Sequence, residues 1–430
     1  MNPEFRRQLW LQFSATRLAL LPILLTACFA AVYLSARDHP APALAVAGAV
    51  LFALLVGGMG TFAAGASVVD EITDRTWDQQ RMSAMQPWAM TWGKLAGATA
   101  YGWYGGALCL LVAVPAALTS TQHTGVPQLT LAAILTGVFL QALLLAVNLQ
   151  LAKIGGRMAR RGGVWALLLV LLWGLGPLFA VTRRDGVSWW NLPFHNIDFV
   201  LASAALFALC ALTAAWRSMA ELLAVRQWPW GWPALALLAT VYLSGFAPGR
   251  PLAVLGVVGL STCAALTYFA LLAEPQARPI WQRVTSRLAG GQWRAAWLQL
   301  PRWPTTLLLA LPFALLTALT VNQATALPWT VSEHAQLQPL ALLLLMARDC
   351  ALALFFAFSP KGRRPVLAFG VLMLVLYGLL PWLLGAAGSN WLLQLAQPLL
   401  APPSLSLVIA AGHAAVALGL LRWRWQATAP

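Results

Sequence analysis

Charge is scarce in this chain, and acidic charge is the scarcest. Asp and Glu account for only 12 of the 430 residues, and charged residues of both signs for 9%. Soluble domains carry about 25% charged residues, so the composition excludes an ordinary water-soluble fold. With 60% hydrophobic residues and a mean hydropathy of +0.74, the sequence predicts a membrane protein.

Cysteine motifs and nucleotide-binding loops are also missing. The five cysteines fall inside apolar runs without the spacing of metal ligands or redox pairs, so we interpret them as small packing residues. The chain has no G-x-x-x-x-G-K-[ST] motif, and the glycine-rich stretch GGMGTFAAG at 57–65 contains no lysine. We therefore expect no metal, no bound cofactor and no ATP hydrolysis on this chain.

Long apolar runs occupy most of the sequence. A helix needs roughly 20 apolar residues to span the hydrocarbon core, because its backbone groups must be satisfied within the segment. We predict an all-α polytopic membrane protein with about 12 transmembrane helices, the first of them a retained signal anchor. The runs lie near 18–36, 43–69, 95–118, 128–152, 163–182, 197–215, 231–247, 251–273, 305–321, 338–358, 365–387 and 399–421.

Basic residues give the chain a net charge of +15, and their distribution predicts its orientation. If the N-terminus lies inside, the outer segments receive only Arg37, Arg183, Arg184 and Arg250 among the lysines and arginines. This asymmetry follows the positive-inside rule and puts both the N- and C-termini in the cytoplasm. We expect a multi-pass protein of the inner (cytoplasmic) membrane that contacts anionic membrane lipids and does not bind nucleic acid.

One short segment between two apolar runs holds a third of the acidic residues: Asp70, Glu71, Asp74 and Asp78. The predicted orientation places 70–94 in the cytoplasm. We expect a helix up to Pro87 that lies on the membrane, with an apolar face made of Trp77, Ala84, Met85, Trp88 and Trp92. Its acidic side suits a protein partner better than an anionic leaflet. The alternative is a solvated loop that only separates two spans.

The same segment carries a resemblance to a transporter family. Glu71 follows the second predicted span, Thr76 comes five residues later, and Gly93-Lys94 open the next span. This pattern resembles ABC-2-type ABC transporter permeases, in which a glutamate, a Gly-Thr pair, a proline and a Gly-Lys frame the coupling helix. Two positions depart from the family pattern: Arg75 stands where glycine is usual, and Pro87 comes slightly late.

The resemblance covers residues 1–226 and implies an ABC-2 (type V exporter-like) six-helix transmembrane domain with an N-terminal interfacial helix. It implies that a separate ABC ATP-binding subunit binds ATP and Mg and docks on the coupling loop 70–94, while this chain is not an enzyme. Because only one full coupling loop exists, we expect a homodimer that contacts through the first six spans, and a single-chain pseudo-dimer of two six-span halves stays open. Glu71 would fix the base of the second span, and Lys94 would hold the third span at the headgroup layer. The implied interface comprises Glu71, Asp74, Thr76, Asp78, Arg81, Pro87, Gly93 and Lys94.

Residues 227–430 contain six further predicted helices with a weaker resemblance. The string QWRAAWLQL at 292–300 resembles PEFRRQLWLQFS at 3–14. A degenerate second copy from about residue 290 and chance convergence of two interfacial helices both stay open. In such a copy, SPKGRRP at 359–365 would be a second candidate coupling loop, with Lys361, Arg363 and Arg364.

Two other classes of protein stay open. An ion-coupled secondary transporter needs ionisable groups near the bilayer midplane, and only Arg348-Asp349 clearly lie there. Adjacent residues point in different directions on a helix, so we expect this pair to bind neighbouring helices. An integral-membrane enzyme acting on lipid-linked substrates would use scattered outer-face groups: His39, Arg183, Arg184, Asp185, His195, Glu333 and His334.

The apolar interior favours a hydrophobic or amphipathic cargo over an ion. A pathway lined by the polar residues Gln141, Asn148 and Gln150 would argue against that preference.

Overall fold

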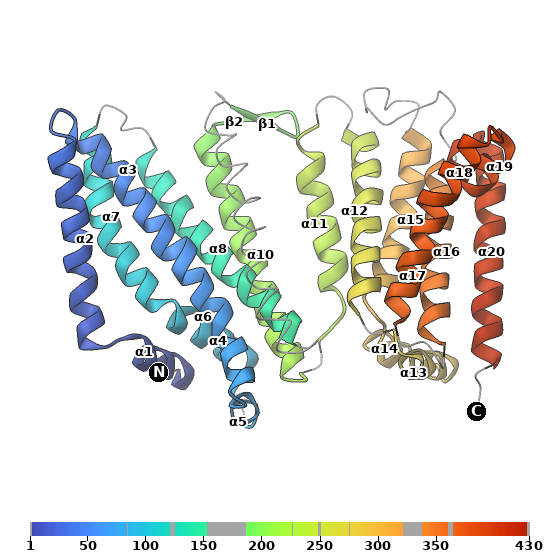
Figure 1. Ribbon diagram of the computed structural model, residues 1–430, viewed down its shortest axis with the longest axis horizontal. Coiled ribbons are helices and arrows are strands. Elements are labelled where there is room, and N and C mark those ends of the chain that lie inside the picture. The colour runs from blue at the N-terminus through green and yellow to red at the C-terminus, as the bar shows by residue number, and fades with distance from the viewer. Residues whose placement is uncertain are drawn as a thin grey trace. The chain divides into compact units, whose positions relative to one another are not determined.

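The computed structural model describes residues 2–83, 85–120, 125–152, 186–225, 227–247, 251–274, 276–320, 338–359 and 364–427 (Figure 1). The chain divides into two compact units. Unit 1 comprises Met1–Val187 and Pro193–Gln227, and unit 2 comprises Ser188–Leu192 and Trp228–Pro430.

Unit 1 is built from helices that pack side by side. It begins with α1 (Pro3–Gln12), α2 (Ala15–Ser35), α3 (Pro40–Phe52), the π-helix η1 (Ala53–Gly60) and α4 (Thr61–Thr73). The short α5 (Trp77–Arg81), α6 (Pro87–Ala98), α7 (Ala100–Thr119), α8 (Val126–Ala152) and α10 (Asn196–Leu222) follow. α3 packs along α7, α4 along α8, and α8 along α10. Two short strands, β1 (Val187–Trp189) and β2 (Leu192–Phe194), precede α10, and their residues Ser188–Leu192 are assigned to unit 2.

Unit 2 is also built from helices. Its first elements are α11 (Gly231–Ser244), α12 (Pro251–Ala273), α13 (Arg278–Ala289), α14 (Trp293–Trp297), α15 (Trp303–Thr320) and α16 (Gln338–Ala357). Then come α17 (Pro365–Leu374), the π-helix η4 (Val375–Leu379), α18 (Leu380–Ala386), α19 (Asn390–Ala396), the 3-10 helix η5 (Pro398–Leu400) and α20 (Pro403–Ala427). α12 packs along α15, and α16 packs along α20.

Ten helical segments among the described residues are long and apolar enough to cross a membrane. They coincide with ten of the predicted runs, so the polytopic, all-helical architecture agrees with the prediction. The predicted run 231–247 contains α11, which is only 14 residues long, and the run 163–182 lies outside the described residues. α3, η1 and α4 form one continuous helix of 34 residues, Pro40–Thr73.

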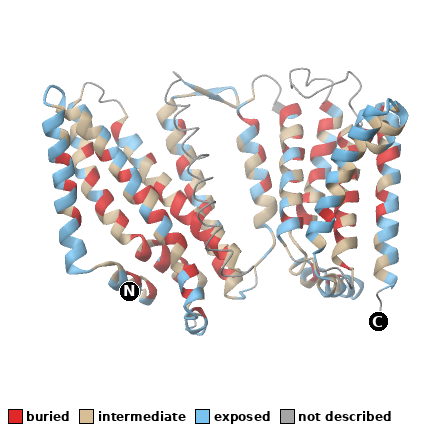
Figure 2. Cartoon of the chain, in the orientation of Figure 1, coloured by how far each residue is buried: buried red, intermediate tan, exposed pale blue. Residues whose placement is uncertain are grey.

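Apolar side chains cover the outer faces of these spans. On α2, Leu20, Ile23 and Leu24 are exposed, as are Val366 and Leu374 on α17. Figure 2 shows exposed residues in pale blue along α2 and α20, and buried residues in red where helices face one another. An apolar surface of this extent is expected against lipid chains rather than water.

Polar groups inside unit 1 serve the packing between helices. Gln141 of α8 donates its amide to the Val56 carbonyl of η1 at 3.0 Å and accepts the Trp103 indole N–H at 2.9 Å. Gln150 donates to the Ser218 hydroxyl of α10 at 2.8 Å. These bonds satisfy a π-helix carbonyl and join neighbouring helices.

Candidate functional site

The turn that ends α4 positions the acidic segment. The Arg75 N–H donates to the Ile72 carbonyl at 3.3 Å, and the Thr76 N–H donates to the Glu71 carbonyl at 2.9 Å. This pair of bonds is a Schellman motif, which satisfies carbonyls left open at a helix end. Arg75 takes the left-handed φ of 59° that the motif needs. The chain is thereby turned sharply into α5.

A buried ion cluster joins the end of α4 to α1 and α6. The Glu71 carboxylate lies between the Lys94 ammonium and the Arg7 guanidinium and forms an ion pair with each. Lys94 also pairs with Glu4 at 3.0 Å, and Arg7 donates to Glu4 through Nε at 3.0 Å and Nη2 at 2.9 Å. Gln8 donates its amide to Glu4 at 3.0 Å. These five residues, the ion cluster, tie together three segments far apart in the sequence.

Two glycines of α6 let α1 approach this closely. A Cβ at Gly93 would lie 2.8 Å from the Glu4 Cβ, and one at Gly97 would lie 2.5 Å from the Gln8 Cβ. Positions four residues apart share one face of a helix, so the two glycines form a strip against which α1 rests. Asn2 begins α1 by accepting the Glu4 N–H at 3.0 Å, which satisfies an open donor.

The ion cluster balances two negative charges with two positive ones. Lys94 is 0% exposed, and Glu4 and Glu71 are buried. Burial opposes the ionisation of Glu4, but the hydrogen bond from Arg7 and the charge of Lys94 outweigh it and lower the Glu4 pKa to about 2. The hydrogen bond to Glu4 in turn raises the pKa of Arg7. Removing one partner would leave a buried charge uncompensated, which is costly.

The predicted interface residues fall into two groups. Asp74, Thr76, Asp78 and Arg81 are exposed on the turn and on α5, whereas Glu71, Gly93 and Lys94 are buried and Pro87 is half-buried. Glu71 does fix the end of α4, through both its carbonyl and its carboxylate. Lys94 was predicted to hold the third span at the headgroup layer, and the structure shows its ammonium enclosed by the carboxylates of Glu4 and Glu71.

α5 is shorter than the predicted surface helix. It ends at Arg81 instead of continuing to Pro87, and Ala84 lies outside the described residues. Pro87 begins α6, at a position where proline is favoured because no intrahelical N–H bond is lost. Trp88 and Trp92 are exposed on α6.

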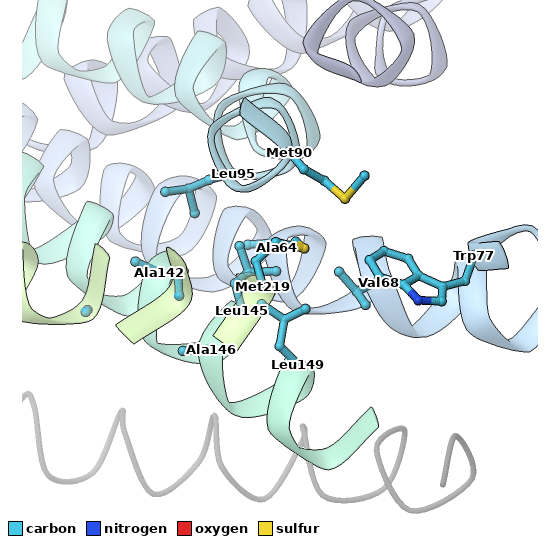
Figure 3. Close-up of a cluster of buried hydrophobic side chains, with 12 residues drawn as sticks. Ala64, Val68, Trp77, Met90, Leu95, Ala142, Leu145, Ala146, Leu149 and Met219 are labelled. Atoms are coloured by element: carbon cyan, nitrogen blue, oxygen red, sulfur yellow. The ribbon is translucent and has the colours of Figure 1, made fainter. Parts of the chain in front are cut away.

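Trp77 was predicted to face lipid and is instead buried within unit 1. Figure 3 shows its indole beside Val68 at one end of a cluster that includes Leu145 and Met219. The Lys94 ammonium lies 5.8 Å from the centre of the Trp77 ring, within the range of a cation–π contact. Packing against neighbouring helices therefore determines the position of Trp77, and this packing ties α5 to the core of the unit.

The sequence analysis did not identify Glu4 and Gln8 as members of the site. Two signals point to them in retrospect. Glu4 is the only acidic residue before Asp38, and a lone carboxylate beside an apolar run needs a partner. The spacing of Gly93 and Gly97 also indicates a helix packed closely against α6.

A second cluster of polar groups is buried at the middle of α16 in unit 2. Arg348 donates to Asp349 through Nε at 2.8 Å, and the hydroxyls of Tyr268 and Tyr377 donate to Asp349 Oδ2 at 2.7 Å each. Arg348 Nη1 lies 3.2 Å from His413 Nδ1. Arginine only donates, so His413 accepts this bond through an unprotonated nitrogen. We call these five residues the midspan cluster.

The midspan cluster changes one prediction. Arg348 and Asp349 bind neighbouring helices, as expected, through groups on α12, η4 and α20. They also pair with each other, which was not expected, with Arg348 Nη2 lying 2.7 Å from Asp349 Oδ1. Both charges are therefore satisfied by protein groups in a region where water is absent.

The remaining predicted residues do not assemble into a site. Arg364 borders an apolar hollow of about 680 Å³ formed by residues such as Pro365 and Leu374. His39 and His195 are exposed at the starts of different helices. In the part of the chain that the structure describes, no group of three His, Cys, Asp or Glu residues could hold a metal ion. Outside that part lie Lys361, Arg363, Arg183, Arg184, Asp185, Glu333 and His334.

Comparison with known proteins adds no family assignment. No protein-family model, curated protein or solved structure matches this chain.

Proposed function

We propose that this chain is the membrane-spanning permease subunit of an ABC-2-type ATP-binding cassette transporter. A separate ATPase subunit binds ATP and Mg and docks on the exposed residues Asp74, Asp78 and Arg81. The chain itself exports a hydrophobic or amphipathic substrate across the cytoplasmic membrane. The spacing of Glu71, Thr76 and Gly93-Lys94 supports the proposal, as does the lack of a nucleotide-binding motif in the sequence.

The single observation that carries the proposal is the rigid link between the exposed turn and the helices. Glu71 gives its carbonyl to the Schellman motif and its carboxylate to the ion cluster. Trp77 fixes the start of α5 in the core of unit 1. A force on α5 therefore moves α4, α6 and α1 together instead of being absorbed by a loose loop. Closure of the ATPase would use this link to shift the spans between inward and outward access.

The test is affinity purification of the tagged chain in mild detergent. Wild type is compared with Asp78→Lys, which reverses an exposed charge on α5 without touching the ion cluster. The matched control is Asp38→Lys, the same change in the exposed turn after α2. We expect an ATPase subunit to co-purify with wild type and the control, and its recovery to fall about tenfold with Asp78→Lys because like charges would meet across the interface.

Two results would contradict the proposal. One is the recovery of no nucleotide-binding protein with wild type. The other is an equal loss of the ATPase with Asp78→Lys and Asp38→Lys, which would point to a general defect rather than to docking on α5.

The midspan cluster favours a second candidate function, an ion-coupled secondary transporter. Ionisable groups buried in membrane spans often mark ion pathways, and Asp349 is 0% exposed among helices. Uptake or efflux by the purified chain in vesicles, driven by an ion gradient without ATP and abolished by Asp349→Asn, would support this alternative. The permease proposal requires transport that depends on ATP and on the partner subunit.

A further inference from the structure

One end of unit 2 carries a helix fixed across the ends of the spans. Val284 of α13 is buried, and the Trp281 and Trp303 rings lie 5.6 Å apart between their centres. Arg278 donates to the Trp425 carbonyl at 3.0 Å. These contacts hold α13 to α15 and to the end of α20. The surface that α13 and α14 present is therefore a defined part of the fold.

The charge of this surface is almost entirely positive. Arg283 and Arg294 are exposed and Arg287 is half-buried, and the segment 276–300 contains no acidic residue. Glu274, which precedes the segment, is held by Arg302 at 3.2 Å. The excess of guanidinium groups produces a positive potential that attracts an anionic partner.

Exposed tryptophans lie in α14 beside Arg294 in the sequence and in the segment just before α11, whose Trp228 contacts Arg294. Trp228, Trp230, Trp293 and Trp297 are each between 41% and 69% exposed. The Arg294 guanidinium lies 5.1 Å from the centre of the Trp228 ring. A guanidinium stacked on an indole keeps its N–H edge for a bidentate phosphate. Indoles favour the layer between lipid headgroups and acyl chains, which an acidic soluble protein does not offer.

We propose that α13, α14 and the tryptophans around Arg294 form a binding surface for anionic phospholipid headgroups. Arg294, Arg283 and Arg287 supply the charge complementary to the phosphate, and the indoles enter the glycerol layer. The charge and the aromatic composition together select an anionic membrane lipid over an acidic protein. The assignment does not depend on the permease proposal.

The test measures lipid-induced stabilisation of the purified full-length chain in detergent. Short-chain phosphatidylglycerol and phosphatidylcholine are titrated separately, and the shift in thermal unfolding midpoint gives the half-saturating lipid concentration. We expect wild type to prefer phosphatidylglycerol. We expect Arg294→Gln to raise its half-saturating concentration about fivefold, the effect of one basic residue at an anionic surface. Arg37→Gln replaces an exposed arginine in unit 1 and should leave the half-saturating concentration of phosphatidylglycerol unchanged.

Arg283→Gln provides a second variant if Arg294→Gln fails to fold, because among the described residues the Arg283 guanidinium bonds within its own helix, to the Pro279 carbonyl. It should weaken phosphatidylglycerol binding by a similar factor and leave phosphatidylcholine binding unaltered. Equal affinity of wild type for both lipids would overturn the proposal and leave an acidic protein as the partner. An equal effect of Arg37→Gln would also overturn it.

Discussion

The ion cluster and the midspan cluster both compensate buried charges, but they do so with different chemical groups. In unit 1, the ion cluster balances Glu4 and Glu71 with Arg7 and Lys94, which come from three separate helices. In unit 2, a single adjacent pair on α16 is completed by two phenols and an imidazole from three other helices. Formal charges from different helices form the ion cluster of unit 1, whereas neutral groups from other helices complete the midspan cluster of unit 2.

The difference follows from where the clusters lie along the helices. In the ion cluster, Glu71 lies in the last turn of α4 and Glu4 in the first turn of α1, and Arg7 is partly exposed while it pairs with these buried carboxylates. The midspan cluster lies about halfway along a membrane span, where each unsatisfied polar atom costs several kcal/mol. Phenol hydroxyls satisfy the remaining lone pairs of Asp349 without bringing further charge into the apolar layer. This comparison predicts different responses to substitution and to pH.

The largest expected effect is the loss of the Asp349 charge. Asp349→Asn leaves Arg348 buried without a counter-charge, and breaking a buried pair in this way costs about 3–5 kcal/mol. Unfolding of the purified chain in detergent, followed by circular dichroism, measures this loss. Asp198→Asn, the same change at an exposed position in α10, should alter stability by less than about 0.5 kcal/mol.

A double variant sharpens this prediction. Replacing Arg348 by Met and Asp349 by Leu removes both charges, so it should be less destabilising than Asp349→Asn alone. A double variant less stable than Asp349→Asn would contradict this. It would mean that lost packing, rather than an uncompensated charge, causes the destabilisation.

An intermediate effect is expected from acid on the ion cluster. The pKa of Glu4 is lowered from 4.5 to about 2, so its ionised form contributes about 3 kcal/mol of stability. That contribution is complete above about pH 4.5 and is lost as the pH falls toward 2. Unfolding free energies measured between pH 6 and pH 2 should decline for wild type. Glu4→Gln should lower the free energy of unfolding at neutral pH and flatten its decline toward pH 2. The control Asp38→Asn should show the same decline as wild type.

The smallest effect concerns how helices end in the two units. α13 and α18 of unit 2 end with Gly291 and Gly388 at positive φ, whereas α4 and α10 of unit 1 end with Arg75 and Ala224 at φ 59°. Glycine adopts this conformation without a Cβ penalty. Arg75→Gly should therefore raise thermal stability by about 1 kcal/mol, and Gly291→Ala should lower it by a similar amount. If Arg75→Gly lowers stability instead, the contacts of the Arg75 side chain stabilise the fold by more than its positive φ destabilises it.

The sequence predicted the spans well because hydropathy is a local property. Ten apolar runs became ten candidate spans, since a membrane span satisfies its backbone within its own segment. The short α11 shows the limit of this reasoning, because the run 231–247 is apolar throughout while its helix is only 14 residues long.

The sequence predicted the members of the ion cluster only in part. Glu71 and Lys94 were singled out by spacing, but their burial depends on α1, which is more than 60 residues away from Glu71 along the chain. The face of a single helix does not reveal which neighbouring helix will cover it. That is why Trp77 was predicted against lipid and why Glu4 was missed.

The continuous helix Pro40–Thr73 is longer than the hydrocarbon core of a bilayer is thick. Thirty-four residues correspond to about 50 Å at 1.5 Å per residue, compared with about 30 Å of hydrocarbon. Even at a tilt of about 40° the helix would extend across nearly 40 Å of depth. Its polar end, with Asp70 and Glu71, therefore projects beyond the apolar layer. A water-soluble protein could therefore bind α5 without entering the bilayer. Protons from the bulk solution could likewise reach the Glu4 carboxylate despite its burial.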